Sequence, residues 1–206
     1  MALIIVEGCK NVGKSYLIDK LKGNGFHVYK WPFQEYFKKF IAQNEEDTGK
    51  NSQSTFHFTA SFDLTLLSLN REGILPFAPL LVDRSFLSNI VLGVLQNRIT
   101  EFEGKKYIDW LVQQKYLENI RIIYVDKVNK EQGRTEKKDN WEFLDYSAQS
   151  ELFTKFLDYL HKEHGIGYGR FVNKFDNESV GDFAKFVIRM NVKGFINKVV
   201  DFLFED

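Results

Sequence analysis

The chain has 206 residues, 44% of them hydrophobic, which suits one compact globular domain spanning residues 1–206. Its 28 Lys and Arg residues balance 28 Asp and Glu residues, which excludes a global electrostatic attraction to nucleic acid or to an anionic membrane. No apolar run approaches the roughly 18 residues of a membrane span. The only cysteine excludes an intrachain disulfide and fits a reducing compartment. These features predict a soluble, cytoplasmic protein with no membrane partner.

Short apolar runs alternate along the chain with longer segments of helical spacing. The expected strands, in chain order, are residues 2–6, 25–31, 79–83, 120–126 and 169–175. Helices are expected at residues 13–21, 56–67 and 152–160, and a last helix from Ser179, where Asp182 completes a capping-box pattern. Strands that alternate with helices predict an α/β fold, in which a five-stranded parallel sheet lies between two helical layers.

The first predicted strand runs directly into a glycine-rich loop. Gly8, Gly13, Lys14 and Ser15 fill the pattern G-x-x-x-x-G-K-[ST] after a strand and before a helix, which is the context of a phosphate-binding loop. In such a loop the backbone N–H groups surround phosphate oxygens, the lysine reaches the β and γ phosphates, and the serine hydroxyl can bind Mg²⁺. A chance match in a glycine turn is the alternative. The predicted ATP-binding segment is Gly8, Cys9, Lys10, Asn11, Val12, Gly13, Lys14, Ser15 and Tyr16.

A second signal stands at the end of the third predicted strand. Asp83 ends the apolar run LLVD, where an acidic group can face Mg²⁺, and Arg84 follows at once. Because ligands bind at the carboxyl ends of the strands in a doubly wound sheet, both residues should lie beside the loop. Lys14, Asp83 and Arg84 are therefore the predicted catalytic residues, and Ser15 with Asp83 the predicted metal ligands. The alternative is that Asp83 caps the next helix and that Arg84 is solvated.

These motifs resemble those of the thymidylate kinase and deoxynucleoside kinase superfamily of P-loop kinases. The resemblance rests on VEGCKNVGKSYL at 6–17 and VDRSFLSN at 82–89. It extends more weakly to VYKWPF at 28–33, FTASFD at 58–63 and the lid-like stretch GRTEKKDNWEFLDY at 133–146. The resemblance implies the three-layer P-loop kinase fold, a lid at about residues 127–141, and ATP and Mg²⁺ as cofactors.

The same resemblance implies a set of substrate-binding residues. Trp31 lies in the aromatic-Pro stretch and Phe58 in the helical segment whose aromatic stacks on the acceptor base, and Lys10 and Arg84 complete the expected acceptor site. Arg134, in the lid-like stretch, is expected to close over the ATP phosphates. The plain alternatives are that Phe58 belongs to the core and that the lid-like stretch is a solvated charged loop.

Residues expected to face the acceptor depart from the family pattern. Thymidylate kinases usually carry an acid in the loop, where this chain has Lys10 and Asn11, and an arginine after the aromatic-Pro stretch, where it has Phe33 and Gln34. The expected reaction is ATP-dependent phosphoryl transfer to a deoxynucleoside monophosphate or a nucleoside, both small-molecule acceptors. Two alternatives stay open: a modified pyrimidine nucleotide or a nucleic-acid end as acceptor, and nucleotide binding without transferase activity.

The oligomeric state is predicted from the same resemblance. Relatives commonly pair through helices on one face of the sheet, and the Phe-rich segment at 56–69 could supply an apolar surface for such a contact. This predicts a homodimer.

Overall fold

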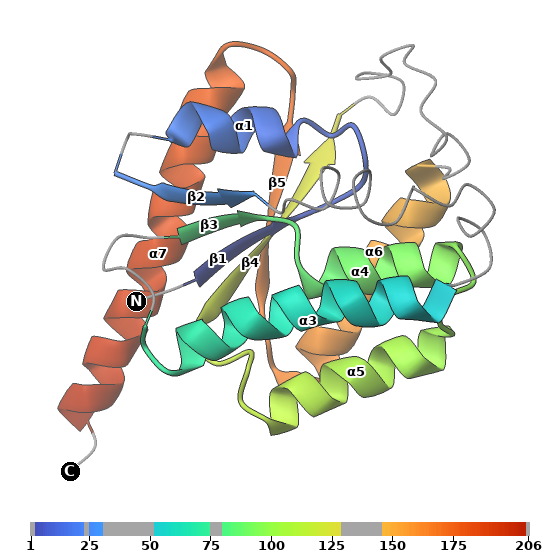
Figure 1. The fold of residues 1–206 in the computed structure, drawn as a ribbon. Coiled ribbons are helices and arrows are strands. Elements are labelled where there is room, and N and C mark those ends of the chain that lie inside the picture. Colours follow the sequence, from blue (N-terminus) through green and yellow to red (C-terminus); the bar gives the residue numbers. More distant parts are fainter. Residues whose placement is uncertain (1–2, 23–24, 31–51, 75–79, 129–145, 205–206) are drawn as a thin grey trace.

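The computed structural model describes residues 3–22, 25–30, 52–74, 80–128 and 146–204, with the backbone alone at 52–55, 58 and 192–204. The elements follow the chain as β1 (Leu3–Glu7), α1 (Lys14–Leu21), β2 (His27–Lys30), α3 (Ser52–Arg71), β3 (Leu80–Asp83), α4 (Phe86–Leu95), α5 (Glu101–Gln113), β4 (Ile120–Lys127), α6 (Tyr146–His164), β5 (Tyr168–Asn173) and α7 (Glu178–Phe204). Strands and helices alternate as the sequence predicts (Figure 1).

All five strands join one sheet in the order β2-β3-β1-β4-β5, and every pairing is parallel. The predicted five-stranded parallel sheet is confirmed. β1 lies at its centre, with Val6 opposite Asp83 of β3 and Glu7 opposite Tyr124 of β4. Because the strands are parallel, their carboxyl ends meet at one edge of the sheet.

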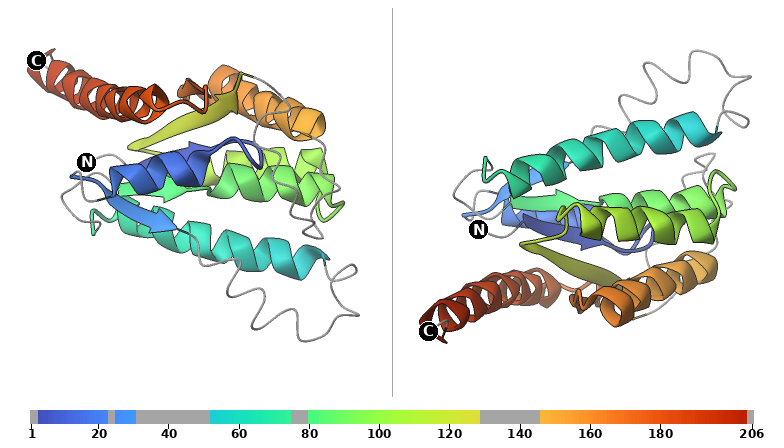
Figure 2. Two further views of the ribbon diagram at one scale, coloured as in Figure 1. Left: turned by 90° about the horizontal axis from the view of Figure 1, so that it is seen from above. Right: turned by 90° about the horizontal axis from the view of Figure 1, so that it is seen from below.

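Helices cover both faces of this sheet and make the predicted three layers. α1 and α7 pack against each other and against the sheet on one face (Figure 1). On the other face α4 lies between α3 and α6, and α5 packs on α4 and α6 (Figure 2). The motifs of the loop and of the turn after β3 therefore lie at a sheet edge that two helical layers flank.

Burial in the strands follows from their place in the sheet. Every residue of β1 and of β3 is buried, as strands covered on both faces require, whereas His27 and Lys30 of the edge strand β2 are exposed. Aromatic side chains from the helices fill the two interfaces. Phe86 of α4, Phe153 and Phe156 of α6 and Phe183 of α7 are at most 1% exposed.

The start of the last helix differs from the prediction. α7 begins at Glu178, and the Ser179 N–H and hydroxyl both donate to Asp176 Oδ1, at 2.8 and 2.7 Å. Asp182 pairs with Lys185 at 3.8 Å. The predicted capping box of Ser179 and Asp182 is therefore wrong, because an aspartate just before the helix already accepts the free N–H of the first turn.

Several apolar side chains of α3 are buried in the core of the chain. Phe56, Ala60, Leu66 and Leu67 are at most 7% exposed, and the polar Ser61 and Thr65 are exposed. These phenylalanine and leucine side chains are thus used for packing within the chain, and the homodimer stays a prediction. Among the helices that the structure describes, none is long and apolar enough to cross a membrane.

Candidate active site

The shape of the glycine loop depends on both of its motif glycines. Gly8 has φ 142° and Gly13 has φ 84°, a backbone region that side chains disfavour. A Cβ atom at Gly8 would lie 2.2 Å from the Val125 carbonyl oxygen, and one at Gly13 would lie 2.4 Å from Asn173 Nδ2. The loop therefore passes so close to the ends of β4 and β5 that neither position can carry a side chain.

Contacts from distant elements support the rest of the loop. Cys9 and Val12 are fully buried, and Asn173 Nδ2 of β5 donates to the Val12 carbonyl at 2.9 Å. The Lys10 N–H donates to Gln149 Oε1 of α6 at 3.0 Å. Both flanks of the loop are thus attached to the second half of the chain.

Lys14, the motif lysine, is turned back into its own loop. Its ammonium donates to the carbonyl oxygens of Gly8 at 2.8 Å and Cys9 at 2.6 Å, and the residue is only 4% exposed. Burial, together with the charge of the nearby Arg84, lowers the pKa of Lys14 to about 7, although Asp83 acts in the opposite direction. An anionic phosphate would offer this cation a stronger partner than two neutral carbonyl groups.

Ser15 and Asp83 bring two oxygen atoms together from α1 and β3. The Ser15 hydroxyl donates to Asp83 Oδ2 at 2.5 Å. Asp83 Oδ1 is buried and has no hydrogen-bond partner in the part of the chain that the structure describes. A hard cation such as Mg²⁺ prefers carboxylate and hydroxyl oxygens, so this pair fits the predicted metal ligands.

Arg84 follows Asp83 in an unusual backbone conformation. Its φ is 73°, its N–H donates to the Val6 carbonyl at 3.0 Å, and its Nη1 donates to the Ser88 hydroxyl at 3.2 Å. The residue is half-buried and directly follows Asp83, whose carboxylate accepts from Ser15, the residue next to Lys14. The charge of Arg84 contributes to the lowered pKa of Lys14. Lys14, Asp83 and Arg84 therefore gather at one point. Ser85, not Asp83, occupies the N-cap position of α4.

Two buried carboxylates that the sequence analysis did not select adjoin this turn. Glu7 is fully buried and accepts hydrogen bonds from the Ser85 N–H at 2.9 Å and from the N–H and the hydroxyl of Ser88. Asp63 of α3 accepts from the Ser85 hydroxyl at 2.9 Å and from Asn89 Nδ2. Burial raises the pKa of Glu7 to about 7 and raises that of Asp63 well above its usual range. A glutamate ending the otherwise apolar strand LIIVE was the signal available in the sequence.

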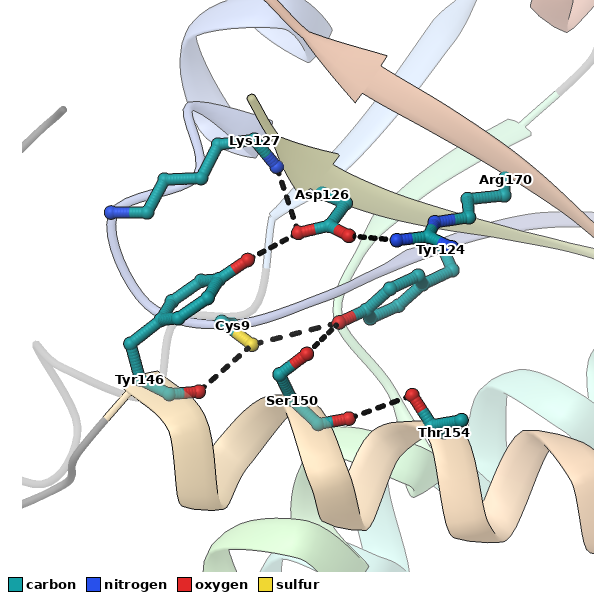
Figure 3. A network of polar contacts seen from close by, with 8 residues as sticks. All are labelled: Cys9, Tyr124, Asp126, Lys127, Tyr146, Ser150, Thr154 and Arg170. Carbon is teal, nitrogen blue, oxygen red and sulfur yellow. Dashed lines mark hydrogen bonds and ion pairs between the residues drawn. The ribbon is translucent and has the colours of Figure 1, made fainter. Parts of the chain in front are cut away.

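A third polar cluster lies at the carboxyl end of β4, next to the start of α6 (Figure 3). Asp126 accepts hydrogen bonds from the backbone N–H of the next residue, Lys127, at 2.8 Å, from Arg170 Nη2 at 2.5 Å and from the Tyr146 hydroxyl. Burial would raise the pKa of Asp126, but the bonds from Tyr146 and Arg170 hold it below its usual range. This cluster fixes the first residue of α6, and α6 in turn supports the loop.

Cys9 links the loop to that cluster (Figure 3). Its Sγ lies 3.7 Å from the Tyr124 hydroxyl and 4.0 Å from the Tyr146 carbonyl oxygen, and the Tyr124 hydroxyl lies 3.4 Å from the Ser150 hydroxyl. Burial raises the pKa of the Cys9 thiol. The side chain is therefore a neutral, space-filling group in the loop, as the absence of a second cysteine suggests.

The remaining predicted residues are less well connected to this point. Asn11, with φ 62°, and Tyr16 are exposed, and Tyr16 lies under Lys20, whose Nζ is 5.5 Å from the ring centroid. Trp31, Arg134 and the side chain of Phe58 lie outside the described residues, as does the predicted lid beyond residue 128.

The glycine loop and the Asp83-Arg84 turn lie on a five-stranded parallel sheet of order 2-3-1-4-5, which is a P-loop architecture. No protein-family model and no curated protein matches the sequence. Solved structures do match. The thymidylate kinase of Candida albicans shares 18% identity, with 92% of each chain covered and a TM-score of 0.65. The thymidylate kinase of Ehrlichia chaffeensis shares 14% identity, covering 91% of this chain and 97% of that one, with a TM-score of 0.60.

A deoxyadenosine kinase belongs to the same set of similar structures. The enzyme of M. mycoides, solved with bound dATP, shares 17% identity over 90% of this chain and 98% of that one, with a TM-score of 0.54. The protein therefore has the P-loop fold of the thymidylate and deoxynucleoside kinases, as the motifs predict. At these identities the likeness establishes the fold, and the reaction has to be argued from the site.

Proposed function

We propose that the protein is an ATP-dependent kinase that transfers a phosphoryl group to a deoxynucleoside monophosphate or a nucleoside. The observation that carries this proposal is the convergence of Lys14, the Ser15–Asp83 pair and Arg84 at the carboxyl edge of the sheet. Phosphoryl transfer needs mainly positioning and charge neutralisation, and these residues supply both. The kinase fold of the similar structures supports the same reaction class.

Each residue has a separate role in this proposal. The loop amides and Lys14 hold the phosphates of ATP, and Lys14 leaves the carbonyl oxygens of Gly8 and Cys9 to do so. Ser15 and Asp83 hold Mg²⁺, which when bound neutralises charge on the transferred phosphate. Arg84 presents a planar fork of N–H donors that suits two phosphate oxygens of the acceptor or of the transferred group.

We place a monophosphate acceptor ahead of a bare nucleoside because two basic residues, Arg84 and Lys10, are proposed to face it. Trp31 and Phe58 complete the proposed acceptor site, and Arg134 in the proposed lid of residues 127–141 is assigned to the ATP side. A charge-assisted hydrogen bond to a phosphate contributes about 1.5–3 kcal/mol. Two such bonds would therefore favour binding of a monophosphate over a nucleoside that has no phosphate.

The test is a panel of natural nucleosides and their monophosphates incubated with ATP and Mg²⁺, with ADP formation as the readout. ADP formation with one class of acceptor supports the proposal and names the class. Transfer to a modified pyrimidine nucleotide or to an oligonucleotide end, but to none of the free natural acceptors, would mean that the protein is a kinase with a different acceptor from the one proposed. Tight ATP binding with no ADP formation in any mixture contradicts the kinase and leaves a nucleotide-binding protein.

A further inference from the structure

Glu7 joins the end of β1 to the turn after β3. It is fully buried, yet it is the residue directly before the phosphate loop. In the described part of the chain its donors all come from the first residues after Arg84: the Ser85 N–H at 2.9 Å, the Ser88 N–H at 3.3 Å and the Ser88 hydroxyl. A carboxylate with this set of partners is built to hold that turn.

The backbone of Arg84 depends on the same strand end. A φ of 73° is unfavourable for a residue with a long side chain and persists only where its surroundings enforce it. Two N–H groups flank the Arg84 Cα atom. The N–H of Arg84 donates to the Val6 carbonyl at 3.0 Å, and the N–H of Ser85 donates to Glu7 Oε1 at 2.9 Å. Two consecutive residues of β1 therefore hold Arg84 in its conformation.

The guanidinium of Arg84 is connected to Glu7 through one hydroxyl group. Ser88 has a single hydroxyl proton, which it donates to Glu7 Oε2, so its lone pairs point elsewhere. Arg84 Nη1 donates a hydrogen bond to the Ser88 hydroxyl oxygen at 3.2 Å. The acceptor at Glu7 thus decides which way the Ser88 hydroxyl points, and the Ser88 oxygen decides where one end of the guanidinium is held.

We propose that Glu7 is a positioning residue for Arg84: through the Ser88 hydroxyl, its buried carboxylate fixes the Arg84 guanidinium beside the phosphate loop. The proposal rests on the proposed function, since it concerns an arginine assigned to the transferred or the acceptor phosphate. It explains why a buried strand that is otherwise apolar ends in a glutamate, next to the loop and 77 positions before the arginine it serves.

The kinetic test uses three variants and their combinations. Glu7→Gln keeps the shape of the side chain and one carbonyl oxygen, but its amide nitrogen cannot accept the Ser88 proton, and Ser88→Ala removes the bridge. We expect each to lower kcat roughly ten- to a hundredfold, the cost of a lost hydrogen bond to a charged group, with the KM for ATP nearly unchanged. The double variant should be no worse than the poorer single one.

The Arg84→Lys background separates positioning from general packing. A lysine lacks the fork that Ser88 orients, so Glu7→Gln should have little further effect on kcat there. If Glu7→Gln costs as much in that background as in the parent protein, Glu7 acts on the fold and not through Arg84, and the proposal is wrong.

A second readout does not depend on activity. The guanidinium N–H signals of Arg84 in ¹⁵N NMR, assigned by their loss in Arg84→Lys, should be sharp in the parent protein and exchange-broadened in Glu7→Gln and Ser88→Ala. Asp63→Asn is the matched control, because Asp63 contacts Ser85 and Asn89 and not Ser88, and the signals should persist in it.

The two readouts distinguish the two proposals. If the parent protein forms no ADP with any acceptor but the Arg84 signals respond as expected, the positioning role of Glu7 is supported and the kinase proposal fails. If the parent protein is active and the Arg84 signals are unchanged in both variants, the positioning role of Glu7 is wrong and the kinase proposal remains. Should Glu7→Gln not fold, Ser88→Ala decides alone, since a serine-to-alanine change leaves the carboxylate two backbone donors.

Discussion

The glycine loop and the turn after β3 meet at the same edge of the sheet, but different interactions hold them. The loop is fixed by close backbone approach at Gly8 and Gly13 and by a neutral hydrogen bond from Asn173 to Val12. The turn is fixed by two buried carboxylates, Glu7 and Asp63. The loop therefore depends on shape, and the turn depends on hydrogen bonds to buried ionisable groups in a low-dielectric environment.

This difference has consequences for what perturbs each part. Shape is insensitive to pH and sensitive to a single added methyl group, whereas a buried carboxylate responds to pH and to the loss of its charge. The four changes below separate the two modes of support, and they are arranged by the size of the free-energy effect.

Lys14→Ala should have the largest effect, because Lys14 is the only loop side chain assigned to the phosphates of ATP. We expect kcat/KM to fall about a thousandfold, or about 4 kcal/mol, with an unchanged melting temperature. Steady-state ADP formation and a thermal melt measure both. Lys20→Ala, on the exposed side of the same helix, is the control and should keep its activity. Near-parent turnover of Lys14→Ala would remove the loop from the mechanism.

The pH dependence of stability should reveal the titration of the buried Glu7 carboxyl group, whose neutral form the folded state favours. Burial raises the pKa of Glu7 from 4.5 to about 7, so the folded state binds this proton more tightly than the unfolded state. The stabilisation is fully present below pH 4.5 and is lost as the pH rises through about 7. From this shift, the parent protein should lose about 3 kcal/mol relative to Glu7→Gln over that range.

Urea unfolding of the parent protein and Glu7→Gln at several pH values between 5 and 8.5 gives this difference directly. The gap between the two free energies of unfolding should change steadily up to about pH 7 and then level off. A gap that is the same at every pH would mean that the folded and the unfolded protein bind the Glu7 proton equally, and that burial does not raise the pKa of this carboxyl group.

Gly13→Ala should test the shape of the loop. The new Cβ would lie 2.4 Å from Asn173 Nδ2, which cannot retreat without breaking its bond to Val12, and φ is 84°. We expect a loss of about 2 kcal/mol in the free energy of unfolding, independent of pH, together with weaker ATP binding. Gly181→Ala of α7 meets nothing within 4 Å and should be neutral or slightly stabilising.

Lys10→Ala should have the smallest effect and concerns the acceptor. If Lys10 supplies part of the charge of the acceptor site, its loss should raise the KM of the acceptor about tenfold and that of ATP much less, a change of about 1.4 kcal/mol. Lys22→Ala, exposed at the end of α1, is the control. A KM change confined to ATP would assign Lys10 to the nucleotide and leave the acceptor site to other residues.

Local signals were sufficient to predict the strands, most of the helices and the loop. Five apolar runs of strand length became the five strands, and the contiguous motif G-x-x-x-x-G-K-[ST] marked the loop. Such features can be predicted from sequence because the residues that signal them are adjacent in the chain. The capping box at Ser179 was misassigned because Asp176, three residues earlier, offers a competing acceptor in the same short stretch.

The support of the site was decided only by the tertiary structure. Glu7 and Ser85 are 78 positions apart, and Val12 and Asn173 are 161 apart, so no local pattern joins them. Parallel pairing brings their strand ends to one edge of the sheet. There the buried Glu7 accepts hydrogen bonds from the turn that carries Arg84. The sequence by itself determined which residues could bind phosphate, because that capacity lies in a contiguous motif. Which carboxyl group holds Arg84 was settled by the packing of β1, β3 and α4, because a buried polar group is meaningful only with the partners that the fold brings to it.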